Sequence, residues 1–350
     1  MWMIVGIVLL VIGGELLVRY ASKLAESAGV PTLLVGLTIV AFGTSSPELI
    51  TSVYGRLLGE SAMALGNVVG SNIFNVFFIL GISALVTPLT VHSNLLVSEV
   101  PVVLVLSLAT VGFALSGTIA TWEAGVLLSI LVLYTVYVLA TTDREFVDLT
   151  ENEFREMIPV PVAGHWSVSV LLVGVGLVLL VVGGHLFITS AVELAASLGM
   201  SEAVIGLTIV AAGTSLPELV TSILAAIRGE SDIAVGNVVG SNLFNLTGVL
   251  GFTGLIGTGE LTVPIQLLEF DLPVMVAGAI VCLPVMFTGR RLNRWEGAVF
   301  VLYYAGYVSY LVLEATGYLV TPHVREALLF FVVPLTLVTF FVIAYREMTK

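Results

Sequence analysis

Two glutamates, Glu48 and Glu218, each follow a proline within a long apolar stretch of the chain. An ionised carboxylate at such a position costs about 3 kcal/mol or more when it lies in a membrane without a partner. Neither glutamate has a Lys or Arg within its own motif or in the matching motif. The partner that suits two unpaired, buried carboxylates is a cation.

Hydroxyl side chains precede both glutamates. Thr44 and Ser45 lie four and three residues before Glu48, a spacing that places side chains on one face of a continuous helix. Thr214 and Ser215 repeat the arrangement before Glu218. We therefore expect each glutamate to share a helix face with the hydroxyls of its own motif.

The prolines next to the glutamates predict a break in each helix. Pro47 and Pro217 lack the amide hydrogen that would bond the carbonyls of Gly43 and Gly213, four residues earlier. Carbonyls freed in this way are ligands for hard cations. We expect a helix that is interrupted within the membrane at each motif.

A second motif contributes a polar stripe. Asn67, Ser71 and Asn75 recur at intervals of four, and Gly66 and Gly70 form a GxxxG step that predicts close helix packing. The second copy of the stripe consists of Asn237, Ser241 and Asn245. Together the motifs offer oxygen ligands without His or Cys, which suits Ca²⁺ or Na⁺ better than zinc or copper.

Part of this polar set has a second interpretation. Small and polar residues also pack and hydrogen-bond membrane helices. For Asn67, Asn72, Asn237 and Asn242 we leave both interpretations open. For the two glutamates we favour ion binding, because unpaired carboxylates at matching positions serve no packing purpose.

The composition places these motifs in a membrane. Of the 350 residues, 58% are hydrophobic and 10% are charged, whereas soluble domains carry about a quarter charged residues. The apolar runs are continuous, which indicates helices and excludes a barrel. The single cysteine excludes a disulfide framework, and a net charge of −12 without a basic patch argues against a nucleic-acid partner. The sequence contains no arrangement of residues typical of an enzyme active site, so we expect that the protein is not an enzyme and has no cofactor. It indicates no protein partner.

Hydropathy predicts eleven spans, near 2–20, 30–55, 62–86, 95–117, 122–141, 167–190, 201–227, 233–256, 263–288, 296–315 and 326–345. Ten of the twelve Lys and Arg residues then lie on one side. By the positive-inside rule this side is the cytoplasm. We expect a multi-pass protein of the cell membrane with its N-terminus outside and its C-terminus in the cytoplasm.

The chain contains an internal repeat at an offset of 170 residues. Residues 36–52 and 206–222 are identical at 14 of 17 positions, and 66–75 and 236–245 at nine of ten. We predict a first repeat of five spans at 1–141, a cytoplasmic linker at 142–166, a second repeat of five spans at 167–315 and an additional C-terminal span within 316–350. Because five is odd, the repeats enter the membrane in opposite orientations, an arrangement typical of secondary transporters.

The two motifs, Gly43–Glu48 and Gly66–Asn75 with their second copies, resemble the alpha repeats of the sodium/calcium exchangers in the cation/calcium antiporter superfamily, of the prokaryotic type. This resemblance implies an all-helical core of ten helices in two inverted repeats. It also implies four cation sites in a diamond, loaded alternately with Na⁺ or Ca²⁺. The first and sixth spans would slide across the core as a gate.

The resemblance assigns roles at matching positions. It implies carboxylate ligands at Glu48 and Glu218, hydroxyl or carbonyl oxygens at Thr44, Ser45, Thr214 and Ser215, further oxygens from Ser71, Asn75, Ser241 and Asn245, and backbone carbonyls of Ala41 and Ala211 for the outer and inner sodium ions. The chain departs from the family pattern in two ways. Asn245 is Asp in some members, so one titratable group is missing here, and the span at 326–345 is added to the usual ten.

The expected function is a Na⁺/Ca²⁺ antiporter of the lipid bilayer that exports Ca²⁺ on the Na⁺ gradient. Two alternatives stay open. One is a H⁺/Ca²⁺ antiporter, in which the same glutamates bind protons. The other is a passive cation channel, against which the inverted repeat argues.

Overall fold

The computed structural model describes residues 2–28, 32–92, 95–141, 166–198, 211–257, 259–287 and 290–315. Over these ranges the chain is helical apart from short connections and four two-residue strands. Within the described residues, eight helices are long and apolar enough to cross a membrane, and the bent pair at Thr32–Leu57 is a ninth if it forms one span. The predicted span 326–345 and most of the predicted linker lie outside the described residues.

The first half contains five helical segments in chain order. They are α1 (Trp2–Ala28); a broken segment of α2 (Thr32–Val35), η1 (Gly36–Val40), α3 (Ala41–Thr44) and α4 (Ser46–Leu57); α5 (Ser61–Ile73) with η2 (Phe74–Leu80) and α6 (Gly81–Val86); η3 (Leu95–Glu99) with α7 (Val100–Ala114); and α8 (Thr121–Thr141).

The second half follows the same order. It consists of α10 (Trp166–Ser197); α12 (Ala211–Gly213) and α13 (Leu216–Ile227); α14 (Ser231–Phe244) with η5 (Asn245–Val249) and α15 (Leu250–Leu255); η6 (Leu267–Asp271) with α16 (Leu272–Phe287); and α17 (Arg294–Ala315). Residues 201–210, which precede α12, lie outside the described residues.

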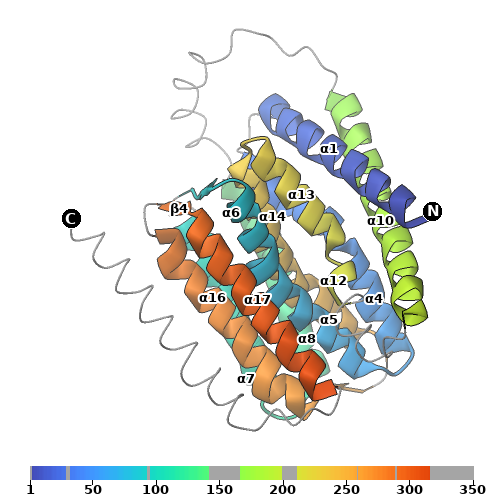
Figure 1. Ribbon diagram of the computed structural model, residues 1–350. Coiled ribbons are helices and arrows are strands. Elements are labelled where there is room, and N and C mark those ends of the chain that lie inside the picture. The colour runs from blue at the N-terminus through green and yellow to red at the C-terminus, as the bar shows by residue number, and fades with distance from the viewer. Residues whose placement is uncertain are drawn as a thin grey trace.

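The helices that carry the second motif form the centre of the molecule. In an apolar 18-residue stretch of Ser231–Leu255, 100% of the residues are buried, and in one of Ser61–Val86 78% are buried. The corresponding share is 17% for α8 and for α17. Figure 1 shows α14 and α5 inside the bundle. The polar stripe of the second motif therefore lies in the protein interior, where it needs partners.

Both central segments change from α-helix to π-helix at this stripe. η2 begins at Phe74, next to Asn75, and η5 begins at Asn245. A π turn takes more residues than an α turn and occurs often at functional sites. Residues four apart, such as Ser71 and Asn75, therefore share a helix face only as far as these asparagines. The spacing of residues in the sequence did not predict this change to π-helix.

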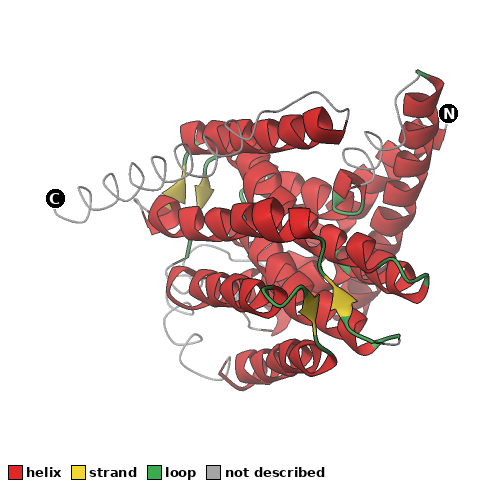
Figure 2. Ribbon diagram, turned by 90° about the horizontal axis from the view of Figure 1, so that it is seen from below, coloured by secondary structure: helices red, strands yellow, loops and turns green. Residues whose placement is uncertain are grey.

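Two short antiparallel strand pairs join the halves. β1 (Leu89–Thr90) pairs with β4 (Arg291–Leu292), and β2 (Thr118–Ile119) pairs with β3 (Leu261–Thr262). Figure 2 shows the two pairs in yellow, well apart from each other. In each pair, one strand lies in the connection that follows the third segment of its half. Its partner lies in the connection that follows the fourth segment of the other half.

The helices α1 and α10 form a tight pair at one edge of the bundle (Figure 1). A Cβ built on Gly13 would lie 2.8 Å from the carbonyl oxygen of Gly176 and 2.8 Å from the amide nitrogen of Leu180. Gly6 and Gly183 make the equivalent approach. Since the two backbones touch at these glycines, the pair is held by close packing of the kind that small residues allow between membrane helices.

Candidate cation site

Both predicted glutamates are fully buried at the start of a helix. Glu48 lies in the first turn of α4 and Glu218 in the first turn of α13, and each is 0% exposed. The segments Thr32–Thr44 and Ser46–Leu57 are bent by 41° relative to each other, and two residues separate the end of α12 from the start of α13. The predicted helix breaks are confirmed, with Pro47 and Pro217 in the first turn, where a missing amide hydrogen costs nothing.

Serines of one half contact the glutamate of the other half. The Ser215 hydroxyl donates to Glu48 Oε1 at 2.6 Å, and the Ser45 hydroxyl donates to Glu218 Oε1 at 3.0 Å. The Ser71 hydroxyl lies 3.5 Å from Glu48 Oε1 and 3.1 Å from the Ser215 hydroxyl. These bonds bring the two motifs together in one buried centre.

The expectation that each glutamate shares a helix face with the hydroxyls of its own motif was wrong for Ser45. It assumed a continuous helix from Ser45 to Glu48. Ser45 instead has φ −82° and ψ 7°, outside the helical region, and α4 begins after it. This break separates the serine from the glutamate of the same motif and directs its hydroxyl across to Glu218.

The centre retains buried oxygen atoms that accept no hydrogen bond. In the part of the chain that the structure describes, Glu48 Oε2 and Glu218 Oε2 have no partner, and neither carboxylate is ion-paired. The other unpartnered oxygens of predicted site residues are Asn75 Oδ1, Ser241 Oγ and Asn245 Oδ1. Leaving such groups unsatisfied costs about 1–3 kcal/mol each, and more when charged. Bound cations would remove that cost.

Two asparagines form hydrogen bonds with the backbone carbonyls of the glutamates. Asn67 Nδ2 donates to the carbonyl oxygen of Glu48 at 3.1 Å and to Ser52 Oγ at 2.9 Å, while Thr214 donates to Asn67 Oδ1 at 3.2 Å. The second copy repeats these contacts with Asn237, Glu218, Ser222 and Thr44. For Asn67 and Asn237 the structure thus favours the packing interpretation, since both ends of each amide are engaged.

Some backbone carbonyls that we expected to be free of hydrogen bonds accept them in the structure. The carbonyl of Gly43 accepts an amide hydrogen from the residues that cap α3, so the prediction for Gly43 was wrong. The Ala41 carbonyl accepts from the Ser45 amide at 3.0 Å and from the Thr44 hydroxyl at 3.4 Å. Ala211 begins α12. Roles for the Ala41 and Ala211 carbonyls stay predictions.

Sequence reasoning overlooked one buried hydroxyl near the second glutamate. Thr221, three residues after Glu218, is 0% exposed and its Oγ1 has no partner among the described residues. The signal was present, because Thr51 and Thr221 belong to the identical part of the repeated motif. Thr221 therefore extends the set of candidate oxygens.

The adjacent serines of the first motif offer a matched test. Ser45 is buried and donates to Glu218, whereas the Ser46 hydroxyl is bonded to the Phe42 carbonyl on the exposed side. Hydrogen bonds to charged groups contribute about 1.5–3 kcal/mol. We expect Ser45→Ala to weaken Ca²⁺ binding by about 10-fold or more, measured by calorimetry in detergent, and Ser46→Ala to leave it unchanged. Equal effects of the two changes would contradict the site.

The chain is similar to known proteins over most of its length. A family model described as sodium/calcium exchanger protein matches residues 1–140 and 168–313. The chain belongs to the sodium/calcium exchanger family. This exchanger-family protein is 36% identical over 312 residues to the inner membrane protein YrbG of Escherichia coli, covering 89% of this chain and 95% of YrbG. It is 31% identical over 342 residues to the sodium/calcium exchanger MaX1 of Methanosarcina acetivorans, covering 88% and 97%.

Solved structures extend the likeness to the fold. The sodium–calcium exchanger NCX_Mj, soaked with Na⁺ and without Ca²⁺, superposes with a TM-score of 0.75 at 28% identity, covering 88% of this chain and 97% of NCX_Mj. Further NCX_Mj structures were soaked with Ca²⁺ or Sr²⁺. The exchanger-family protein is thus a multi-pass membrane transporter of cations and not an enzyme, which confirms the family resemblance of its two motifs.

Proposed function

We propose that this protein exchanges Na⁺ for Ca²⁺ by alternating access and exports Ca²⁺ on the Na⁺ gradient. The observation that carries the proposal is the reciprocal contact between the halves, in which Ser215 bonds Glu48 and Ser45 bonds Glu218. It places both carboxylates in one buried centre without a basic partner among the described residues. The names of NCX_Mj and MaX1 support Na⁺ and Ca²⁺ as the exchanged pair.

The proposed architecture is two inverted repeats of five spans, 1–141 and 167–315, with a cytoplasmic linker at 142–166 and an additional span in 316–350. The strand pairs support the inversion. β1 follows three spans of its half and β4 follows four spans of the other half, yet they pair. Parallel halves would put them on opposite membrane faces, whereas inverted halves put them on the same face. The orientation remains N-terminus outside and C-terminus in the cytoplasm.

The proposed ligands are oxygens from both halves. They are the side chains of Glu48, Glu218, Thr44, Ser45, Thr214, Ser215, Ser71, Asn75, Ser241 and Asn245 and the carbonyls of Ala41 and Ala211. An all-oxygen set with two carboxylates suits Ca²⁺ and Na⁺.

The two negative charges account for obligatory exchange. Coulomb repulsion between carboxylates is strong in a medium of low dielectric constant. Charge neutrality at the pair requires one Ca²⁺ or two Na⁺. A carrier without ions is therefore a high-energy state, and the protein reorients mainly when it is loaded, which couples the two fluxes.

Uptake of ⁴⁵Ca²⁺ into proteoliposomes tests the coupling. We expect vesicles loaded with Na⁺ to accumulate ⁴⁵Ca²⁺ when diluted into Na⁺-free buffer, and a proton gradient alone to drive none. Valinomycin and K⁺ should hold the membrane potential constant in both arms. Uptake driven only by protons would replace the proposal with H⁺/Ca²⁺ exchange. Uptake that needs no counter-ion would indicate a channel.

A further inference from the structure

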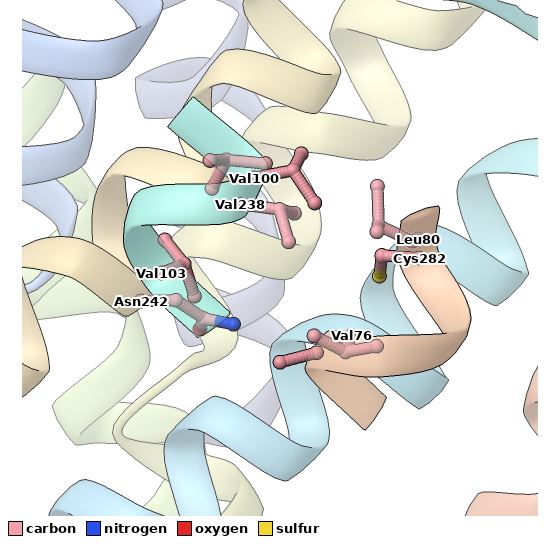
Figure 3. A pocket seen from close by; sticks show the side chains of 9 residues that line it. Val76, Leu80, Val100, Val103, Val238, Asn242 and Cys282 are labelled. Carbon is pink, nitrogen blue, oxygen red and sulfur yellow. The ribbon is translucent and has the colours of Figure 1, made fainter. Parts of the chain in front are cut away.

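A third asparagine of the second motif, Asn242, lies between the polar centre and an apolar cavity. It is 3% exposed on α14, three residues before Asn245. The cavity is otherwise lined by apolar side chains and Cys282, and Figure 3 shows Asn242 among Val76, Val103 and Val238. A carboxamide next to such a surface finds its hydrogen-bond partners only on the other side.

Those partners belong to the first half of the chain. Asn75 Nδ2 donates to Asn242 Oδ1 at 2.9 Å, and Asn242 Nδ2 lies 3.4 Å from the carbonyl oxygen of Asn72. Asn75 is fully buried, and among the described residues its Oδ1 accepts no hydrogen bond. Because a carboxamide is planar, fixing its nitrogen also fixes the direction of its oxygen. Asn242 therefore determines where the free oxygen of Asn75 points.

Asn75 lies on the polar face of the central segment. Asn75 follows Ser71 by four residues, and the Ser71 hydroxyl lies 3.5 Å from Glu48 Oε1 and 3.1 Å from the Ser215 hydroxyl. Residues four apart on a helix share a face. Asn75 consequently lies on the same face of this segment as the Ser71 contact to Glu48.

The repeat contains a second pair of asparagines at matching positions, and these two are not hydrogen-bonded to each other. Asn72 and Asn245 occupy the positions of Asn242 and Asn75 in the other half. Yet Asn72 Oδ1 and both amide atoms of Asn245 have no partner in the described chain. The same two residue types thus form the bond in one half and leave it open in the other. The Asn75–Asn242 bond is therefore not a general requirement of the fold.

We propose that Asn242 is a positioning residue that holds the side-chain oxygen of Asn75 in the cation site. The inference rests on the proposed function in that it takes the buried centre to bind Ca²⁺. It does not depend on which ion drives transport. It assigns Asn242 a role in the site that differs from both packing and direct ligation.

Equilibrium Ca²⁺ binding to the purified full chain, measured by calorimetry, tests this role in a double-mutant cycle. Partners that orient a metal ligand affect metal affinity by about 10–100-fold. We expect Asn242→Ala to weaken Ca²⁺ binding by about tenfold, and the double variant with Asn75→Ala to bind no more weakly than Asn75→Ala alone. Asn242→Asp keeps an acceptor for Asn75 Nδ2, so we expect it to restore affinity, but only when Asn75 is present.

Several results would overturn the inference. One is an equal loss from Asn242→Ala in the wild-type and Asn75→Ala backgrounds, which indicates a purely structural role. Another is restoration by Asn242→Asp without Asn75, which indicates a direct effect of the added charge. Asn242→Leu keeps the branched shape of the side chain without an acceptor, so it can replace Asn242→Ala in the cycle if the alanine variant folds poorly. Failure of wild type to bind Ca²⁺ would instead refute the proposed function.

Discussion

We expect Glu48→Gln, and separately Glu218→Gln, to lower Na⁺-driven ⁴⁵Ca²⁺ uptake by about 100-fold or more. The amide keeps the shape of the side chain and removes one of two negative charges from a fully buried centre. Removing one partner of a buried charge interaction costs about 3–5 kcal/mol, and each 1.4 kcal/mol is about a tenfold change in affinity. The measurement is the initial rate of uptake in proteoliposomes at equal protein content.

Glu123→Gln provides the matched control. The Glu123 carboxylate accepts from the Ala120 amide at 2.8 Å at the start of α8, and a glutamine oxygen can accept the same bond. We expect this variant to exchange at the wild-type rate. Retention of exchange by both Glu48→Gln and Glu218→Gln would refute the carboxylate pair as the ion site. Thermal unfolding of each variant shows whether a lost rate reflects a lost fold.

We expect Gly240→Ala to lower both the stability and the exchange rate. A Cβ on Gly240 would lie 2.6 Å from the carbonyl oxygen of Leu37 and 2.8 Å from the Cβ of Ala41. The obstacle is largely backbone, so α14 and the segment of Ala41 must move apart. Overpacking of this kind costs about 1–3 kcal/mol. Because Ala41 begins α3, which ends at Thr44 before the break at Ser45, the displacement reaches Thr44 and Ser45 in the site.

The control for this change is Gly125→Ala on α8. Its Cβ would meet only Leu255 Cδ2 among the described residues, at 3.9 Å, which is ordinary contact. Alanine also has the higher helix propensity, by about 1 kcal/mol. We expect the melting temperature in detergent to fall for Gly240→Ala and to stay level or rise for Gly125→Ala. Unchanged melting and exchange in Gly240→Ala would contradict the close approach of the two helices.

This contact also shows how far the GxxxG prediction extends. Gly236 and Gly240 do press against Leu33, Leu37 and Ala41. For Gly66 and Gly70 the repeat places the corresponding partners at residues 203–211, nearly all of which lie outside the described part of the chain. The second copy, Gly236 and Gly240, thus packs closely, although the prediction was made for Gly66 and Gly70. No described residue comes within 4 Å of a Cβ built on Gly66 or Gly70, so their close packing stays a prediction.

Several features of the site could be predicted from residue types. Burial of Glu48 and Glu218 and the breaks at Pro47 and Pro217 follow from local chemistry, since they depend on the apolar surroundings and on a missing amide hydrogen. The helix-face argument failed because Ser45 leaves the helical conformation. The π-helix at Asn75 was also missed, because α and π turns differ in hydrogen bonding and not in composition.

The amino-acid sequence by itself determined the membrane class, the repeat and the oxygen-rich, lysine-free chemistry of both motifs, because hydropathy and charge are properties of the residues alone. Tertiary structure decided which groups meet. Ser215 reaches Glu48, Ser45 reaches Glu218, and Asn75 bonds Asn242 but Asn245 does not bond Asn72. These contacts join residues about 170 positions apart, so they depend on how the halves pack against each other and not on spacing along a helix.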